Sequence, residues 1–135
     1  MYRQILVSAN DVAFQRILYR SNPSDDIKEY HLNTVTFGVN CAPYLAIRTM
    51  IQLAEDYKHQ YPLASQILRS NMYVDDVLAG FHSINDANQA KKELCTVLES
   101  AGFSLRKWTS NQKEILADLP CNYLLHKDFL DFDSS

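Results

Sequence analysis

The sequence contains little glycine, proline or cysteine, and no long apolar run. Three Gly and four Pro in 135 residues are too few for a collagen-like or linker sequence. No apolar stretch is long enough to span a membrane, and the start "MYRQILVSAND" lacks the basic residues and apolar core of a signal peptide. We therefore expect a protein of the cytosol or the nucleus, with no membrane partner.

Metal-ligand spacing is also missing from the cysteines and histidines. No CxxC or zinc-type pattern links the three Cys and four His, which are Cys41, Cys95, Cys121, His31, His59, His82 and His126. The pattern favours free, buried thiols in a reducing compartment over a zinc or disulfide role.

The chain also lacks an excess of basic charge, since its net charge is −3. Three of its 16 Asp and Glu residues, but only one of its 13 Lys and Arg residues, lie in the tail "KDFLDFDSS", residues 127–135. The rest of the chain is nearly neutral, so its charge neither supports nor excludes a polyanionic partner.

The sequence does have enough apolar residues for a packed core, with 47% hydrophobic and 11% aromatic residues. The patterning predicts strands at 14–21 and 29–37, a helix at 41–57, two short strands within 71–82, a helix at 85–101, a strand at 103–108 and a final helix at 109–119. Asn40 is the candidate N-cap of the first helix, and Gly102 is placed to end the second. Helices on one face of an antiparallel sheet form an α+β fold.

Two adjacent carboxylates, Asp75 and Asp76, lie in the apolar stretch "NMYVDDVLAGF", with no basic residue within five positions. Asp is a common turn residue, so the pair could simply form a tight hairpin. Such hairpins usually need Gly or Asn, however, and "VDDV" has neither. Because the two adjacent negative charges repel each other, a bound divalent cation would reduce that repulsion. Carboxylate oxygens are hard ligands that suit Mg²⁺ or Mn²⁺.

Five stretches in order carry a resemblance to a known family: "MYRQI", "FQRILYR", "TVTFGVNCAPYLAIR", "YVDDVLAG" and "GFSLRKWTSN". They resemble the reverse transcriptases of BEL/Pao long-terminal-repeat retrotransposons from residue 1 to about 120. The resemblance implies an incomplete reverse-transcriptase-like palm, in which an antiparallel sheet carries the YVDD hairpin and helices cover one face. It places this partial palm at residues 1–120 and leaves an acidic, poorly ordered extension at 121–135.

The resemblance also implies a role for each matching residue. Asp75 and Asp76 would be the catalytic, metal-binding carboxylates, with Asp76 the less stringent of the two. Residues in contact with nucleotide, template or primer would be Tyr2, Gly38, Asn40, Pro43, Tyr73, Val74 and Lys107. Tyr2 would exclude a 2′-hydroxyl by steric conflict, whereas Lys107 could equally be an ordinary exposed lysine. Phe37 stands where many retroviral relatives carry Gln, so that contact is not transferred.

The family's first catalytic Asp would precede Met1, so we expect the chain as given to be a fragment that is inactive by itself. Its partners would be an RNA or DNA template-primer, deoxynucleoside triphosphates and the remaining fingers, thumb and RNase H regions. A relic that keeps the fold and only weak nucleic-acid binding is the alternative. An unrelated metal-dependent phosphohydrolase is disfavoured, since only Asp86 and His82 are possible further ligands nearby in the sequence.

Overall fold

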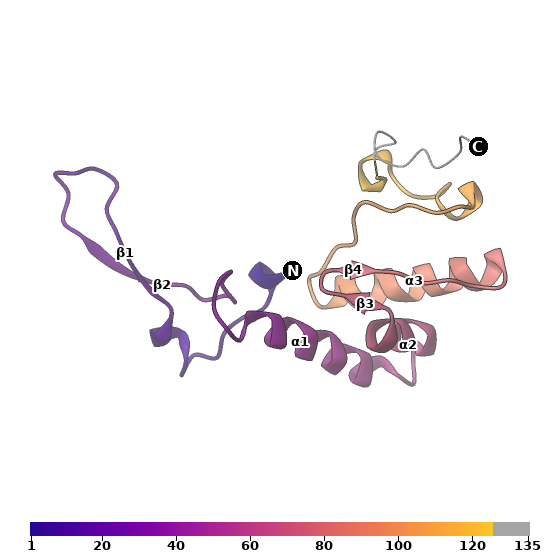
Figure 1. Cartoon of the computed structure of the whole chain (residues 1–135), viewed down its shortest axis with the longest axis horizontal. Helices are drawn as coiled ribbons and strands as arrows, with labels where there is room; N and C mark the ends of the chain where they lie inside the picture. The colour runs from indigo at the N-terminus through magenta and orange to yellow at the C-terminus, as the bar shows by residue number, and fades with distance from the viewer. Residues whose placement is uncertain (126–135) are drawn as a thin grey trace.

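The computed structural model of the chain describes residues 1–125. Three helices lie together at one end, whereas a two-stranded hairpin projects from the other (Figure 1). The helices are α1 (Ala42–Tyr57), α2 (Pro62–Ser70) and α3 (Ile84–Ser100), and the strands are β1 (Arg16–Tyr19), β2 (Lys28–His31), β3 (Met72–Tyr73) and β4 (Asp76–Val77). Short 3-10 turns are η1 (Tyr2–Gln4), η2 (Val12–Phe14), η3 (Lys113–Ile115) and η4 (Cys121–Tyr123). These helices and hairpins form a small α+β fold, the class that the sequence predicts.

The core lies between the three helices. Two of the three predicted helices, 41–57 and 85–101, are confirmed to within a residue, and each buries the predicted face. The buried core side chains are Met50, Leu53 and Ala54 of α1, Ala64, Ile67 and Leu68 of α2, and Ala90, Leu94, Val97 and Leu98 of α3. Burying a Leu, Ile or Met side chain contributes about 1.5–3 kcal/mol, so this cluster supplies much of the driving force for folding.

Helix α2 is absent from the sequence-based prediction, and its N-terminus is capped from another helix. No side chain of α2 caps its own first turn. Instead, the backbone N–H groups of Leu63 and Ala64 donate to Glu93 Oε2 of α3 at 2.9 and 3.2 Å. Gln89 Nε2 donates to the other Glu93 oxygen at 3.0 Å. Glu93 is only 7% exposed, so its negative charge meets the positive end of the α2 dipole largely away from water.

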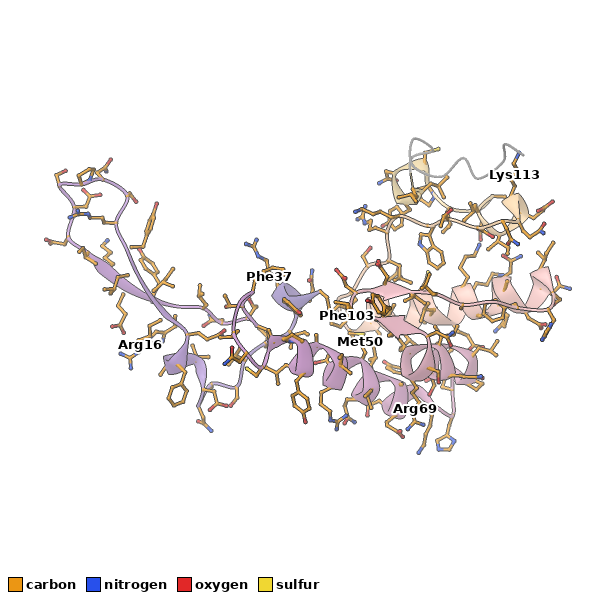
Figure 2. The ribbon with its side chains drawn as sticks, in the orientation of Figure 1. Arg16, Phe37, Met50, Arg69, Phe103 and Lys113 are labelled. Atoms are coloured by element: carbon orange, nitrogen blue, oxygen red, sulfur yellow. The ribbon has the colours of Figure 1, made fainter. Side chains whose placement is uncertain are left out.

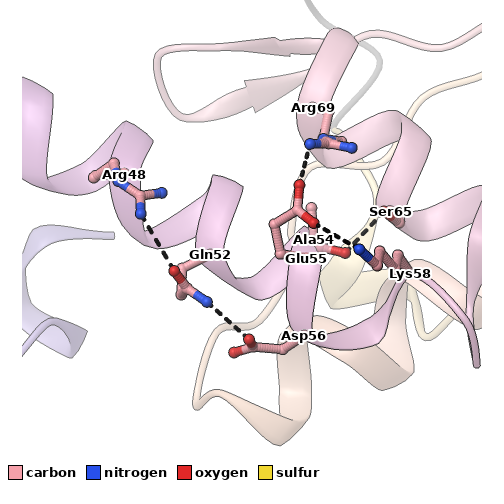
Figure 3. A network of polar contacts seen from close by, with 8 residues as sticks. All are labelled: Arg48, Gln52, Ala54, Glu55, Asp56, Lys58, Ser65 and Arg69. Atoms are coloured by element: carbon pink, nitrogen blue, oxygen red, sulfur yellow. Dashed lines mark hydrogen bonds and ion pairs between the residues drawn. The ribbon is translucent and has the colours of Figure 1, made fainter.

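Polar contacts also join α1 to α2 (Figure 3). Buried Ser65 donates its hydroxyl to the Ala54 carbonyl at 2.8 Å, and Glu55 forms ion pairs with Arg69 and Lys58. Because the ion pairs are solvated, they contribute little, and Ser65 is the stronger link between the helices.

The ends of α3 follow from local sequence. Ser83 accepts a hydrogen bond from the Asp86 N–H at 3.1 Å, which caps the N-terminus. Gly102 has a φ of +78°, and the Phe103 N–H donates to the Leu98 carbonyl at 2.9 Å. Gly102 therefore ends the helix as predicted, because a left-handed residue is needed at this position.

Helix α1 begins differently from the prediction. Cys41, not Asn40, is its N-cap residue, and no side chain there accepts a capping hydrogen bond. A turn from Val39 to Ala42 leads directly into the helix. Cys41 therefore already has helical φ and ψ (−85° and −8°), whereas side-chain capping requires an extended N-cap.

The two hairpins form separate two-stranded sheets in residues 1–125, so the single antiparallel sheet that we predicted is wrong. Strands β1 and β2 pair from Arg16–His31 to Tyr19–Lys28, and all eight residues are exposed. The chain returns to the helices through a bridge between Leu6 and Thr34. Since the β1–β2 hairpin projects away from the helices, its edges do not reach β3 or β4 (Figure 1).

Two further predicted elements, the strand at 103–108 and the helix at 109–119, do not form. Lys107 has a φ of +59°, which interrupts an extended strand, and Trp108 keeps only one bridge, to Leu124. The expected capping box at Thr109 and Gln112 is replaced by the short turn η3. Buried Lys91 of α3 donates to the Ile115 carbonyl and the Asp118 carboxylate, which holds this segment in an irregular path.

The predicted acidic extension lies mostly in residues 126–135, outside the described residues. Within 121–125, Tyr123 stacks under the Arg106 guanidinium, 4.2 Å from the ring centre. All three cysteines are free, but Cys41 and Cys121 are exposed rather than buried as predicted. No helix in residues 1–125 has the length and apolar character that crossing a membrane would require.

The Glu93 cap generates the first prediction. Glu93→Ala should lower the free energy of unfolding by about 1–3 kcal/mol, because two N–H groups lose their acceptor in a buried site. Glu93→Gln should lower it less, since an amide oxygen still accepts. Urea unfolding followed by circular dichroism measures both. Glu99→Ala, an exposed change on the same helix, is the matched control, and an equal loss in that variant would contradict the capping role.

The Lys91–Asp118 contact generates a prediction of pH dependence. The hydrogen bond from Lys91 lowers the pKa of Asp118 below the value of about 3.9 that an Asp has in an unfolded chain. The contribution of this contact to stability is therefore fully present above about pH 4. It is lost as the pH falls through the lower pKa that Asp118 has in the folded protein. Asp118→Asn should weaken the acid dependence of the unfolding free energy, measured by urea titration between pH 2 and 7. Lys91→Met should weaken it equally, and an unchanged slope in both variants would refute this origin.

Candidate functional site

The β3–β4 hairpin rests on the helical core and presents its turn away from it. Met72 pairs with Val77, and both side chains pack against the buried cluster. Asn71 closes the open end, because its Nδ2 donates to the Leu78 carbonyl at 2.8 Å and its own carbonyl accepts from the Leu78 N–H at 3.0 Å. Tyr73, on the opposite side, is 71% exposed.

The turn itself consists of Val74 and Asp75, since Tyr73 pairs with Asp76. Val74 has a φ of +57°, the left-handed region that a β-branched residue rarely adopts. Such a conformation costs about 1–3 kcal/mol and is retained where surrounding structure or function demands it. The absence of Gly or Asn in "VDDV" therefore does not prevent the tight turn, but it makes the turn strained.

A cavity of about 210 Å³ joins this turn to the start of the chain. Its lining residues are Met1, Tyr2, Phe37, Val74 and Asp75. Three predicted site residues, Tyr2, Val74 and Asp75, thus meet in one place although more than 70 positions separate the first from the other two. Asp76 lies next to the cavity in sequence, in β4, and is exposed.

The predicted residues around the start of α1 do not line this cavity. Gly38 has a φ of +89°, which explains the glycine, and a Cβ added there would meet nothing within 4 Å. Asn40 and Pro43 are exposed, in the turn before α1 and in its first turn. These residues leave an open surface on which a ligand could approach the backbone closely.

Lys107 is the predicted residue with the least structural support. It is exposed, and its side chain forms no hydrogen bond or ion pair within residues 1–125. Its positive φ of +59° turns the chain between Arg106 and Trp108. Its assignment to the site therefore stays a prediction.

Phe37 is a cavity residue to which we assigned no role. Its ring lies against that of Tyr2, with centroids 4.8 Å apart and planes inclined by 56°. Figure 2 shows Phe37 beside η1, far from the projecting hairpin that carries Arg16. The aromatic character of Phe37 beside the glycine turn is the sequence signal that could have identified it.

The donor set at the turn suits a hard divalent cation, although it is incomplete. Asp75 and Asp76 supply two exposed carboxylates. Mg²⁺ is commonly held by one or two carboxylates, with water and substrate phosphates completing its octahedron. Within residues 1–125 no three His, Cys, Asp or Glu side chains form a metal-binding group. The residues present therefore fit a weak site that a substrate phosphate or a further ligand would complete.

Comparison with known families assigns the class. The family model described as "Reverse transcriptase (RNA-dependent DNA polymerase)" matches residues 3–124. Because the match spans most of the sequence, the chain belongs to the reverse transcriptase family. The domain it carries is that of an RNA-directed DNA polymerase. No curated protein and no solved structure matches the chain.

The strain at Val74 generates a prediction. Val74→Asn should raise the free energy of unfolding by about 1 kcal/mol, because Asn adopts the left-handed conformation at lower cost. Leu78→Asn is the matched control, since Leu78 is 71% exposed on the same hairpin without a positive φ. Thermal and urea unfolding measure both variants. A Val74→Asn protein no more stable than the control would show that the turn is unstrained.

Proposed function

We propose that this chain is part of the RNA-directed DNA polymerase of a BEL/Pao-class retrotransposon. The observation that carries the proposal is the convergence of Tyr2 and Asp75 on one cavity, in a chain whose residues 3–124 match the reverse transcriptase family. Support for the finer class comes from the five ordered sequence stretches, above all "TVTFGVNCAPYLAIR" and "YVDDVLAG".

The proposed reaction is template-directed deoxynucleotidyl transfer. The primer 3′-hydroxyl attacks the α-phosphorus of a deoxynucleoside triphosphate, a new phosphodiester bond forms, and pyrophosphate leaves. Asp75, assisted by Asp76, would hold Mg²⁺ or Mn²⁺, which in two-metal sites stabilises the attacking and leaving oxygens. The rest of the protein contributes position and charge rather than covalent chemistry.

The other proposed roles follow the surfaces around the turn. Tyr73 and Val74 would support the primer terminus, which agrees with their exposure at the hairpin tip. The open backbone from Gly38 to Pro43 would contact the incoming nucleotide and the template. Lys107 would approach the departing pyrophosphate.

The 135-residue polypeptide by itself should not extend a primer. Two adjacent carboxylates supply fewer metal ligands than the reaction needs, and we propose that a further carboxylate completes the site. Loss of one preorganised electrostatic group lowers rates by about 10²–10³. An engineered protein that joins the chain to the fingers, the thumb and a carboxylate-bearing palm segment of a related enzyme should synthesise DNA on an RNA template. We refer to it as the joined enzyme.

Asp75→Asn should abolish primer extension by the joined enzyme, because it removes a carboxylate charge at the reacting phosphates. Asp56→Asn, an exposed change on α1 away from the cavity, should leave extension intact. Extension on an RNA template with each nucleotide type is the assay. Synthesis by the Asp75→Asn variant would refute the catalytic assignment. An inactive joined enzyme would favour the alternative, a relic that keeps the fold and weak nucleic-acid binding.

Metal binding can be tested on the chain alone. Titration with Mg²⁺ or Mn²⁺ should shift or broaden NMR signals centred on residues 73–77, with weak affinity because water completes the coordination. Asp75→Asn should remove the effect. Signals that change first at the acidic tail residues 127–135 would count against the site.

A further inference from the structure

The pairing of Phe37 with Tyr2 is set by the backbone that carries both residues. The Val35 N–H donates to the Ile5 carbonyl and the Val7 N–H to the Asn33 carbonyl, each at 2.9 Å. These two hydrogen bonds pair residues 5–7 with residues 33–35 in antiparallel fashion, and we call this pairing the frame. The frame includes Val35, which is 2% exposed and therefore fixed. Tyr2, three residues before the frame, and Phe37, two residues after it, consequently lie at the same end.

Phe37 is the only described aromatic partner of Tyr2. The Tyr2 hydroxyl forms no hydrogen bond within residues 1–125, and η1 holds only the backbone, through the Gln4 and Ile5 N–H groups. A tilted pair with centroids 4.8 Å apart has the geometry of a favourable aromatic interaction. The direction of the Tyr2 ring therefore depends on Phe37.

Phe37 is 68% exposed, so much of its ring surface is accessible to a ligand. The exposed part of its ring, with Tyr2, forms the aromatic wall of the cavity that Asp75 also lines. Pockets that enclose a whole drug-sized ligand measure about 300–1,000 Å³. At about 210 Å³ this cavity holds only part of a nucleotide, and a sugar ring between the aromatic wall and the Asp75 carboxylate suits its size.

We propose that Phe37 is a positioning residue that holds the Tyr2 ring against the nucleotide sugar, and thereby sets the discrimination between deoxyribonucleotides and ribonucleotides. This inference rests on the proposed polymerase function and adds a residue to it. Without Phe37 the Tyr2 ring can rotate away, and the space for a 2′-hydroxyl opens even though Tyr2 is still present.

The first test needs no catalysis. In the 135-residue chain with isotope-labelled tyrosine, Phe37→Leu should shift the Tyr2 ring signals and remove contacts between the Tyr2 ring and residue 37, whereas Phe37→Tyr should preserve them. Phe14→Leu, a change at an exposed phenylalanine outside the cavity, is the matched control and should leave the Tyr2 signals unchanged. Unchanged Tyr2 signals in Phe37→Leu would overturn the positioning role.

The second test measures nucleotide selection by the joined enzyme. Phe37→Leu should raise kcat/KM for ribonucleotides relative to deoxyribonucleotides by roughly two- to twelvefold, the ratio that an aromatic pair of about 0.5–1.5 kcal/mol corresponds to. Phe37→Tyr should keep the wild-type selectivity, and Tyr2→Ala should admit ribonucleotides at least as well as Phe37→Leu does.

The two tests separate the inference from the function on which it rests. Wild-type selectivity in Phe37→Leu, together with relaxed selectivity in Tyr2→Ala, would overturn the role of Phe37 and leave the polymerase proposal standing. A wild-type joined enzyme that incorporates no nucleotide at all would overturn the polymerase proposal. It would also overturn the proposed role of Phe37 in nucleotide selection. In that case the Tyr2 signals still decide whether Phe37 positions the ring.

Discussion

Hydrogen bonds from the first turn of α2 to Glu93 join α2 to α3, the two helices between which the β3–β4 hairpin lies in the sequence. The position of the YVDD turn depends on these hydrogen bonds. Helix α2 ends at Ser70 and β3 begins at Met72, so the hairpin continues almost directly from this helix. Met72 and Val77 then pack onto the helices that Glu93 connects. A buried carboxylate that does not line the cavity therefore supports the helices on which the Asp75 hairpin rests.

The site combines a rigid support with a strained tip. The helical core holds the base of the β3–β4 hairpin, whereas Val74 at its tip keeps a left-handed backbone that costs free energy. The opposite wall, with Tyr2 and Phe37, is carried by the paired backbone of residues 5–7 and 33–35. Two parts of the chain that share no secondary-structure element thus line one partly open cavity that includes Asp75.

Regular elements with a strong local signal were predictable. The apolar stripe of α1 and the Gly102 end of α3 rest on side-chain spacing and local hydrogen bonds, whereas the Ser83 cap is a local signal that the prediction did not use. Helix α2 escaped prediction because its nine residues follow Tyr61 without a local cap. The predicted helix at 109–119 failed for the converse reason, since a suitable local pattern is overridden by the contacts of Lys91 with Ile115 and Asp118.

By itself the sequence determined the chemistry of the site: two adjacent carboxylates, an aromatic residue at position 2, a flexible glycine at position 38, and an order of motifs that indicates a reverse transcriptase. Only the tertiary structure decided that Tyr2, Phe37 and Asp75 share one cavity, that the turn falls on Val74 and Asp75, and that the hairpins form separate sheets. The reason is physical. Side-chain chemistry is local to a residue, whereas a cavity wall depends on long-range packing and backbone pairing, which no short stretch of sequence specifies.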